Sequence, residues 1–247
     1  MRLCLILERV PIVSIMARLT HFKLCPMSRS IRLLLGEIEV DATLVDEMPW
    51  DWRPAFLALN PAGDLPVLEF EGGLVISGCY AISEYLGEML RRGEPDERRR
   101  DPFPGSDEDR AEVRRLVDWS HRKLHGEVTR EFLREKIEAR LRPELARKQP
   151  DSDLLRALRT NLRYHMSYLS YLAGQRRWLA GDELSFADLA AAGQLSCLDY
   201  IDEVPWDSYP PTRDWYARIK SRPAFRPLLA DRLPGIVPPA HYGDLDF

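Results

Sequence analysis

The sequence has few cysteines, no excess of basic residues and no long uninterrupted apolar run. Its cysteines, Cys4, Cys25, Cys79 and Cys197, show neither metal-ligand spacing nor the density of a disulfide scaffold, which indicates a reducing cytoplasm and predicts no metal site. The formal net charge of -4 gives no global basic field, so nucleic acid is not expected as the main partner. With 45% hydrophobic residues among 247, the chain can bury a substantial core in one or two domains.

Residues 1–16 contain apolar runs, but Glu8 and Arg9 interrupt them. Neither a signal peptide nor a membrane span fits such a segment. Met16 directly precedes a strand-like pattern. We therefore expect residues 1–16 to be an N-terminal extension outside the fold, with Met16 as an alternative to Met1 as the true start.

The periodicity of apolar residues after Met16 alternates between strand and helix. A hairpin turn is expected at the Glu-Gly-Gly sequence of residues 71–73. The pattern predicts the order βαβ(α)ββα, with strands at 18–24, 42–46, 66–70 and 74–77, helices at 26–38 and 80–90, and a loop or short helix at 50–59.

The second half of the chain has helical periodicity throughout. Residues 93–108 combine charge, proline and glycine and are expected to be a linker, followed by an all-helical domain over 109–232. Leu184–Tyr200 is nearly all apolar and should be the central helix, and Ser185 with Asp188 fits a capping box at its start.

Several segments together resemble the glutathione transferase superfamily, over roughly residues 17–230. The resemblance implies an α/β plus all-α, glutathione-transferase-like fold: a thioredoxin-like N-terminal domain (βαβαββα) over 17–92 and a helical-bundle C-terminal domain. The segments that carry it, in matching order and spacing, are Cys25–Arg32, Asn60–Leu68, Ala81–Leu86, Trp178–Asp182 with the capping box, and Ser221–Phe225.

The family resemblance also implies where glutathione would bind. Cys25 and Ser28 match the positions whose thiol or hydroxyl stabilises the glutathione thiolate at the start of the first helix, so either is a catalytic candidate if the chain is an enzyme. The alternative is that Ser28 only caps this helix and Cys25 only ends the first strand. Leu65 and Pro66 match the cis-proline site whose backbone pairs with glutathione, although Pro66 also has a structural role there.

The chain departs from the family pattern before the third helix of the N-terminal domain. Active relatives carry a Glu-Ser or Gln-Ser pair that holds the γ-glutamyl end of glutathione, whereas this chain has Gly78 and Cys79, which we regard as vestigial glutathione-binding positions. Glycine offers no carboxylate, and cysteine is a poor hydrogen-bonding group. This departure favours a protein that is not an enzyme and requires no cofactor, with glutathione remaining open as a ligand.

The proline-rich, apolar C-terminal segment, residues 233–247, could dock on its own domain or on a partner. Together with the aromatic residues after the second strand, it resembles FtsZ-binding, glutathione-transferase-like division proteins of alphaproteobacteria. That resemblance implies a homodimer in the cytoplasm at the division site, which binds FtsZ filaments and promotes their curvature and constriction. A membrane division protein is a second candidate partner, through the tail. The candidate partner-binding residues are Trp50, Trp52, Asp244, Leu245, Asp246 and Phe247.

Some alternatives stay open. Trp50 and Trp52 could pack in the core instead of contacting a partner. His121 and His125 have the i, i+4 spacing of a helical metal site, but no third ligand lies nearby in the sequence, so a packed or solvated pair is expected. The rival function is that of a glutathione-dependent transferase or thiol reductase acting on small electrophiles.

Overall fold

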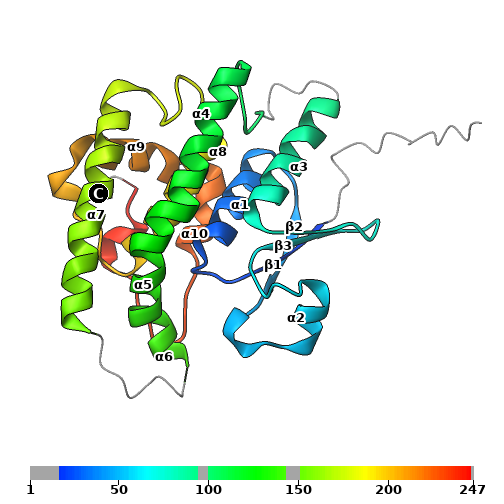
Figure 1. Cartoon of the computed structure of the whole chain (residues 1–247), viewed down its shortest axis with the longest axis horizontal. Coiled ribbons are helices and arrows are strands. Elements are labelled where there is room, and N and C mark those ends of the chain that lie inside the picture. The colour runs from blue at the N-terminus through cyan, green and yellow to red at the C-terminus, as the bar shows by residue number, and fades with distance from the viewer. Residues whose placement is uncertain (1–16, 94–99, 143–150, 246–247) are drawn as a thin grey trace, which may run out of the picture.

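The computed structural model describes residues 17–93, 100–142 and 151–245. The expected extension, residues 1–16, and the terminal Asp246 and Phe247 lie outside the described residues. Figure 1 shows a small sheet domain beside a larger group of helices, with α1 and α3 above the sheet and α2 below it.

The N-terminal domain has the predicted order of elements. Its sheet has the strand order β2-β1-β3-β4, in which β1 runs parallel to β2 and antiparallel to β3. The thioredoxin-like fold is therefore confirmed. The elements are β1 (Ala17–His21), α1 (Pro26–Glu37), β2 (Ala42–Asp46), η2 (Pro49–Asp51), α2 (Pro54–Leu59), β3 (Val67–Phe70), β4 (Val75–Ser77) and α3 (Cys79–Arg92).

The remaining described residues form the predicted helical domain. Its first helix, from α4 to α6, keeps helical backbone angles across each junction and includes two π-helical stretches, η3 and η4. The elements are α4 (Asp107–Asp118), η3 (Trp119–Thr129), α5 (Arg130–Leu133), η4 (Arg134–Glu138), α6 (Ala139–Leu141), α7 (Ser152–Gln175), α8 (Phe186–Tyr200), η5 (Trp206–Ser208), α9 (Pro210–Lys220), η6 (Pro223–Phe225), α10 (Arg226–Leu229) and η7 (Ala240–Gly243).

Part of the segment expected to be a linker, 93–108, packs against the helical domain. Phe103 is fully buried, and the carbonyl of Pro102 accepts a hydrogen bond from the Phe186 amide at 2.8 Å. Helix α4 already begins at Asp107, because Ser106 caps it by accepting from the Asp109 amide at 3.3 Å. The sequence did not predict these contacts, because the segment is rich in polar residues.

Helix α8 is the centre of the molecule, as predicted, and every residue in it is buried. The Asp188 carboxylate accepts from the amides of Ser185 and Leu179 and from the Trp215 indole, at 2.8 to 3.0 Å. The capping box therefore also joins α8 to its neighbours. No helix within the described ranges is both long and apolar enough to span a bilayer.

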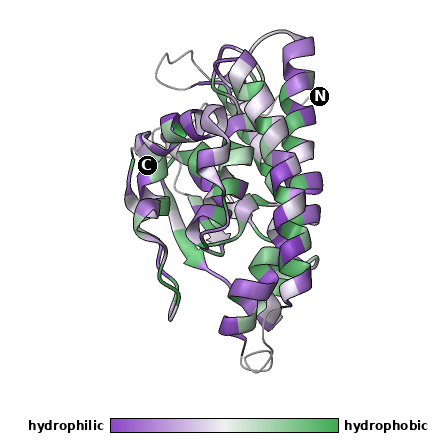
Figure 2. Ribbon diagram, turned by 90° about the vertical axis from the view of Figure 1, so that its left-hand side faces the viewer, coloured by the Kyte–Doolittle hydropathy of each residue, from purple (hydrophilic) through white to green (hydrophobic). Residues whose placement is uncertain are grey.

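The packing of the other helices follows from their sequence patterns. Purple and green segments alternate along the helices in Figure 2, as expected for helices that bury one face. Trp178, Trp206 and Trp215 are buried, whereas Trp119 is only half-buried and packs edge-on against Tyr168 at 5.0 Å between ring centroids.

The C-terminal segment docks on its own chain. Leu233, Ile236 and Tyr242 are 7%, 6% and 1% exposed, and a β-bridge joins the first two. Of the alternatives left open by the sequence, self-docking therefore holds for most of the described segment. Beyond Tyr242, Asp244 and Leu245 are exposed.

Candidate functional site

Cys25 lies at the N-cap of α1, next to the sheet. Its thiol is directed at the Leu65 carbonyl, 4.0 Å away. Burial raises the pKa of the Cys25 thiol, and this effect outweighs the opposing effects of Ser28 and of the Met27 amide. The sulfur is therefore protonated at neutral pH, which is unfavourable for a nucleophile.

Ser28 is fully buried, and its hydroxyl has no hydrogen-bond partner among the described residues. Helix α1 has no side-chain cap, so Ser28 does not have the capping role that the sequence left open. Its side chain lowers the pKa of the Cys25 thiol, without a hydrogen bond of ordinary geometry between the two groups. Both candidate catalytic residues therefore lie together at the start of α1.

Leu65 and Pro66 follow α2 and lead into β3. The peptide bond between them is cis, as the family resemblance implied. Leu65 is 8% exposed, and its carbonyl faces the Cys25 thiol. The Leu65 carbonyl and the Cys25 thiol thus lie side by side.

Gly78 and Cys79 lie at one end of α3, its N-terminus. The φ angle of Gly78 is +89°, a region that side-chain-bearing residues rarely adopt, so the local backbone itself favours glycine. A Cβ at this position would meet no atom within 4 Å. The first turn of α3 contains no acidic residue. This end therefore offers no carboxylate to a ligand's ammonium group.

The Cys79 thiol is engaged by the helical domain. Its sulfur lies 3.5 Å from Nε2 of His121, and Nδ1 of His121 lies 3.2 Å from Nε2 of Gln194. The sulfur also lies 3.6 Å from the Met27 carbonyl. Burial raises the pKa of Cys79 well above its ordinary value and lowers the pKa of His121 to about 3, so both groups are neutral at pH 7.

The sequence did not reveal the Cys79–His121–Gln194 chain. Only the i, i+4 pair of His121 and His125 pointed to this face. No group of three or more potential metal ligands lies close together in the described part of the chain. Burial also lowers the pKa of His125.

The two candidate partner tryptophans differ in exposure. Trp50 is half-buried and packs edge-on against Phe22, with ring centroids 5.1 Å apart. Trp52 is 62% exposed and has a positive φ of 48° at the end of η2. Leu44 and Met48, in the same part of the domain, are 44% and 38% exposed. Trp52 is thus available for a contact, whereas most of Trp50 serves the core.

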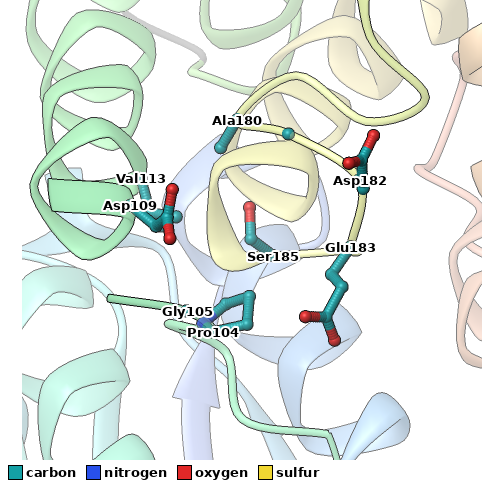
Figure 3. A pocket seen from close by; sticks show the side chains of 9 residues that line it. Pro104, Gly105, Asp109, Val113, Ala180, Asp182, Glu183 and Ser185 are labelled. Atoms are coloured by element: carbon teal, nitrogen blue, oxygen red, sulfur yellow. The ribbon is translucent and has the colours of Figure 1, made fainter. Parts of the chain in front are cut away.

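Figure 3 shows a separate cavity of about 220 Å³ in the helical domain. Asp109, Asp182 and Glu183 are among its lining residues, but it includes none of the residues predicted to bind glutathione or a partner. The Asp109 carboxylate already accepts from the Ser106 amide at 2.9 Å. The cavity therefore does not coincide with the candidate site.

Both domains match glutathione transferase families. The model for the glutathione S-transferase N-terminal domain matches residues 24–89, and the model for the C-terminal domain matches residues 123–223. Glutathione S-transferase 2 of Saccharomyces cerevisiae is 29% identical over 187 residues, covering 73% of each chain.

Similarity over nearly the whole chain extends to FtsZ-localized protein A of Caulobacter vibrioides, which is 44% identical over 238 residues, covering 95% of this chain and 100% of that protein. Among solved structures, FzlA from C. crescentus has a TM-score of 0.86 at 43% identity and covers 94% of this chain and 99% of its own. A glutathione S-transferase from Rhodospirillum rubrum has a TM-score of 0.87 at 44% identity, covering 94% and 100%.

Proposed function

This chain belongs to the glutathione S-transferase family, and we propose that within it the chain is a non-catalytic cell-division protein that binds FtsZ filaments. The observation that carries the proposal is the similarity to FtsZ-localized protein A over 95% of this chain and all of that relative. The proposal includes a homodimer that acts in the cytoplasm at the division site and promotes filament curvature and constriction.

The residues at the candidate glutathione site support a role without glutathione chemistry. An active family member would contact the γ-glutamyl end of glutathione where this chain has Gly78 and Cys79, and the first turn of α3 holds no acid. Each lost hydrogen bond to a charged group costs about 1.5–3 kcal/mol, so losing two weakens binding by roughly 10²-fold or more. The protonated Cys25 thiol adds no activated nucleophile.

Exposed apolar groups support a protein partner. Trp52 is a large ring held by structured backbone with 62% of its surface exposed, and large aromatic residues dominate binding energy at interfaces. We assign Trp52, with the half-buried Trp50, to the FtsZ contact. Asp244 and Leu245 lead into the terminal residues and form the second candidate contact, either with FtsZ or with a membrane division protein.

The test of the FtsZ contact is co-sedimentation with polymerised FtsZ. The chain should pellet with filaments, and Trp52→Ala should weaken this by roughly tenfold or more, as for an interface hot spot. Tyr171→Ala is the matched control, because Tyr171 is 65% exposed on α7. Failure of the unchanged chain to pellet would contradict the proposal. Equal effects of both substitutions would contradict the assignment of Trp52.

The chain end is tested by charge reversal. Asp244→Lys should leave dimerisation and the melting temperature nearly unchanged, because Asp244 is exposed and such a charge contributes little to folding. It should nevertheless impair division in cells. Normal division of cells that carry this variant would refute a partner role for Asp244 and Leu245. Co-sedimentation of the variant with FtsZ would distinguish FtsZ from a second division protein as the partner.

A glutathione-dependent transferase or thiol reductase is the second candidate. The buried Ser28 hydroxyl, which has no hydrogen-bond partner among the described residues and lies beside Cys25, favours it. Calorimetry with millimolar glutathione and turnover of a generic aryl halide test it. Under our proposal both experiments give no signal. If turnover is seen, Cys25→Ala or Ser28→Ala should abolish it while the fold stays intact.

A further inference from the structure

Arg29 on α1 is a fully buried arginine whose donors reach several parts of the chain. Its Nε donates to the Lys23 carbonyl at 2.6 Å, and one terminal nitrogen donates to the hydroxyls of Ser196 and Tyr242, both at 3.0 Å. The other terminal nitrogen lies 3.3 Å from the Asp231 carboxylate. One side chain of the N-terminal domain thus contacts α8 and the C-terminal segment together.

The charges around Arg29 do not cancel locally. Arg32, one turn further along α1, takes both oxygens of Asp231 at 2.7 and 3.1 Å. Two buried guanidinium groups therefore share one carboxylate. The excess positive charge is stabilised by neutral oxygens and by the ring faces of Tyr200 and Tyr242, whose centroids lie 5.8 and 6.0 Å from the Arg29 guanidinium carbon.

Tyr242 is the part of this cluster that belongs to the C-terminal segment. It is 1% exposed, and its hydroxyl accepts from Arg29 while donating to the Leu228 carbonyl at 3.0 Å. The preceding stretch of the segment has its own anchor, because the Tyr200 hydroxyl donates to the Ile236 carbonyl at 3.2 Å. Of the described chain, Gly243, Asp244 and Leu245 follow the Tyr242 anchor.

We propose that Arg29 positions the C-terminal tip, Gly243, Asp244 and Leu245: by binding the Tyr242 hydroxyl, it sets the place and direction in which these residues follow the anchor. Residues 233–245, which we call the strap, are then held on the N-terminal domain by the hydrogen bond between Tyr242 and Arg29. The position of the tip therefore depends on the contact between the two domains. This inference rests on the proposed function only where the tip is taken as a partner contact.

The strap is tested by a double-mutant cycle of Arg29→Met and Tyr242→Phe, read by hydrogen exchange of the amides in residues 233–245. Tyr242→Phe keeps the ring and removes only the hydroxyl, so it remains informative if Arg29→Met fails to fold. We expect Tyr242→Phe to raise exchange in this segment at least about tenfold, with α8 and β1 unchanged. The double variant should add nothing beyond the larger single effect.

Tyr209→Phe is the control, because its hydroxyl donates to the Arg163 carbonyl at 3.0 Å, outside this cluster. It should leave exchange in the strap unchanged. Unchanged exchange in Tyr242→Phe, or strictly additive effects in the cycle, would overturn the proposal. If exchange rises but division proceeds normally with Tyr242→Phe, the strap stands and the partner role of the tip in the proposed function fails.

Discussion

The contact of α1 with α8 and the contact of α3 with η3 both join the two domains, but they differ in physical character. At the first, Gly193 lies so close to α1 that an added Cβ would be 2.7 Å from the Pro26 carbonyl oxygen. At the second, Cys79 and His121 meet through a neutral polar contact of 3.5 Å. Shape controls the first contact and hydrogen bonding controls the second, so substitutions and pH should affect them differently.

The largest decrease in the free energy of unfolding is expected from Gly193→Ala. The new methyl group would overlap the Pro26 carbonyl and the Ser30 hydroxyl, which lies only 2.4 Å from the Cβ position, so α1 and α8 must separate. Overpacking of this kind costs about 1–3 kcal/mol. Urea denaturation measures the loss.

Gly174→Ala is the matched control for that substitution. Gly174 is also inside a helix, α7, but an added Cβ there would meet no atom within 4 Å. Helix propensity should make this variant more stable, by up to about 1 kcal/mol. A destabilisation of equal size in both variants would mean that shape does not control the α1–α8 contact.

The second-largest effect is a dependence of the free energy of unfolding on pH, which arises at the α3–η3 contact. Burial lowers the pKa of His121 to about 3 from its ordinary 6.5, so the unfolded chain binds this proton more readily than the folded protein does. Stability is therefore lost as the pH falls from about 6.5 toward 3. Between pH 6.5 and 5 the loss is at most about 2 kcal/mol.

His121→Asn should remove this part of the acid sensitivity. The comparison is the difference in unfolding free energy between pH 7 and pH 5 for the variant and the unchanged chain. Other buried histidines, such as His21 with a pKa lowered to about 4, remain in both proteins and cancel. Identical pH dependence of the two would show that His121 is not held neutral by burial.

The smallest effect is expected from Cys79→Ser. A serine hydroxyl can replace the thiol between the Met27 carbonyl and the His121 ring, because both neighbours are hydrogen-bonding groups. The free energy of unfolding should change by less than about 1 kcal/mol, the scale of one net hydrogen bond. A decrease in the free energy of unfolding several times larger would mean that close packing controls the α3–η3 contact, as it does the contact at Gly193.

Much of the fold could be predicted because its signals are local. The βαβ(α)ββα order follows from apolar periodicity, and the burial of α8 follows from the apolar run at Leu184–Tyr200. The packed segment around Phe103 was missed, since its polar neighbours resemble a linker and its burial depends on Phe186 from a distant part of the chain.

The candidate site was predictable only in part. Cys25, Ser28, Leu65 and Pro66 were found through the family resemblance, and the structure brings Ser28 and Leu65 beside Cys25. His121 and Gln194 were not connected with Cys79, because they lie 42 and more residues further along the chain and no local spacing links them. The exposure of Trp52, in contrast to the packing of Trp50, was likewise undecided by sequence.

The sequence by itself determined the elements, their order and the absence of an acidic group at Gly78, since periodicity, turn residues and residue chemistry are properties of short segments. The tertiary structure alone decided that Arg29 is buried with Tyr242, that Gly193 meets Pro26, and that Cys79 faces His121. The physical reason is that these contacts join residues far apart in the chain. Their burial, charge balance and pKa depend on what the fold brings beside them.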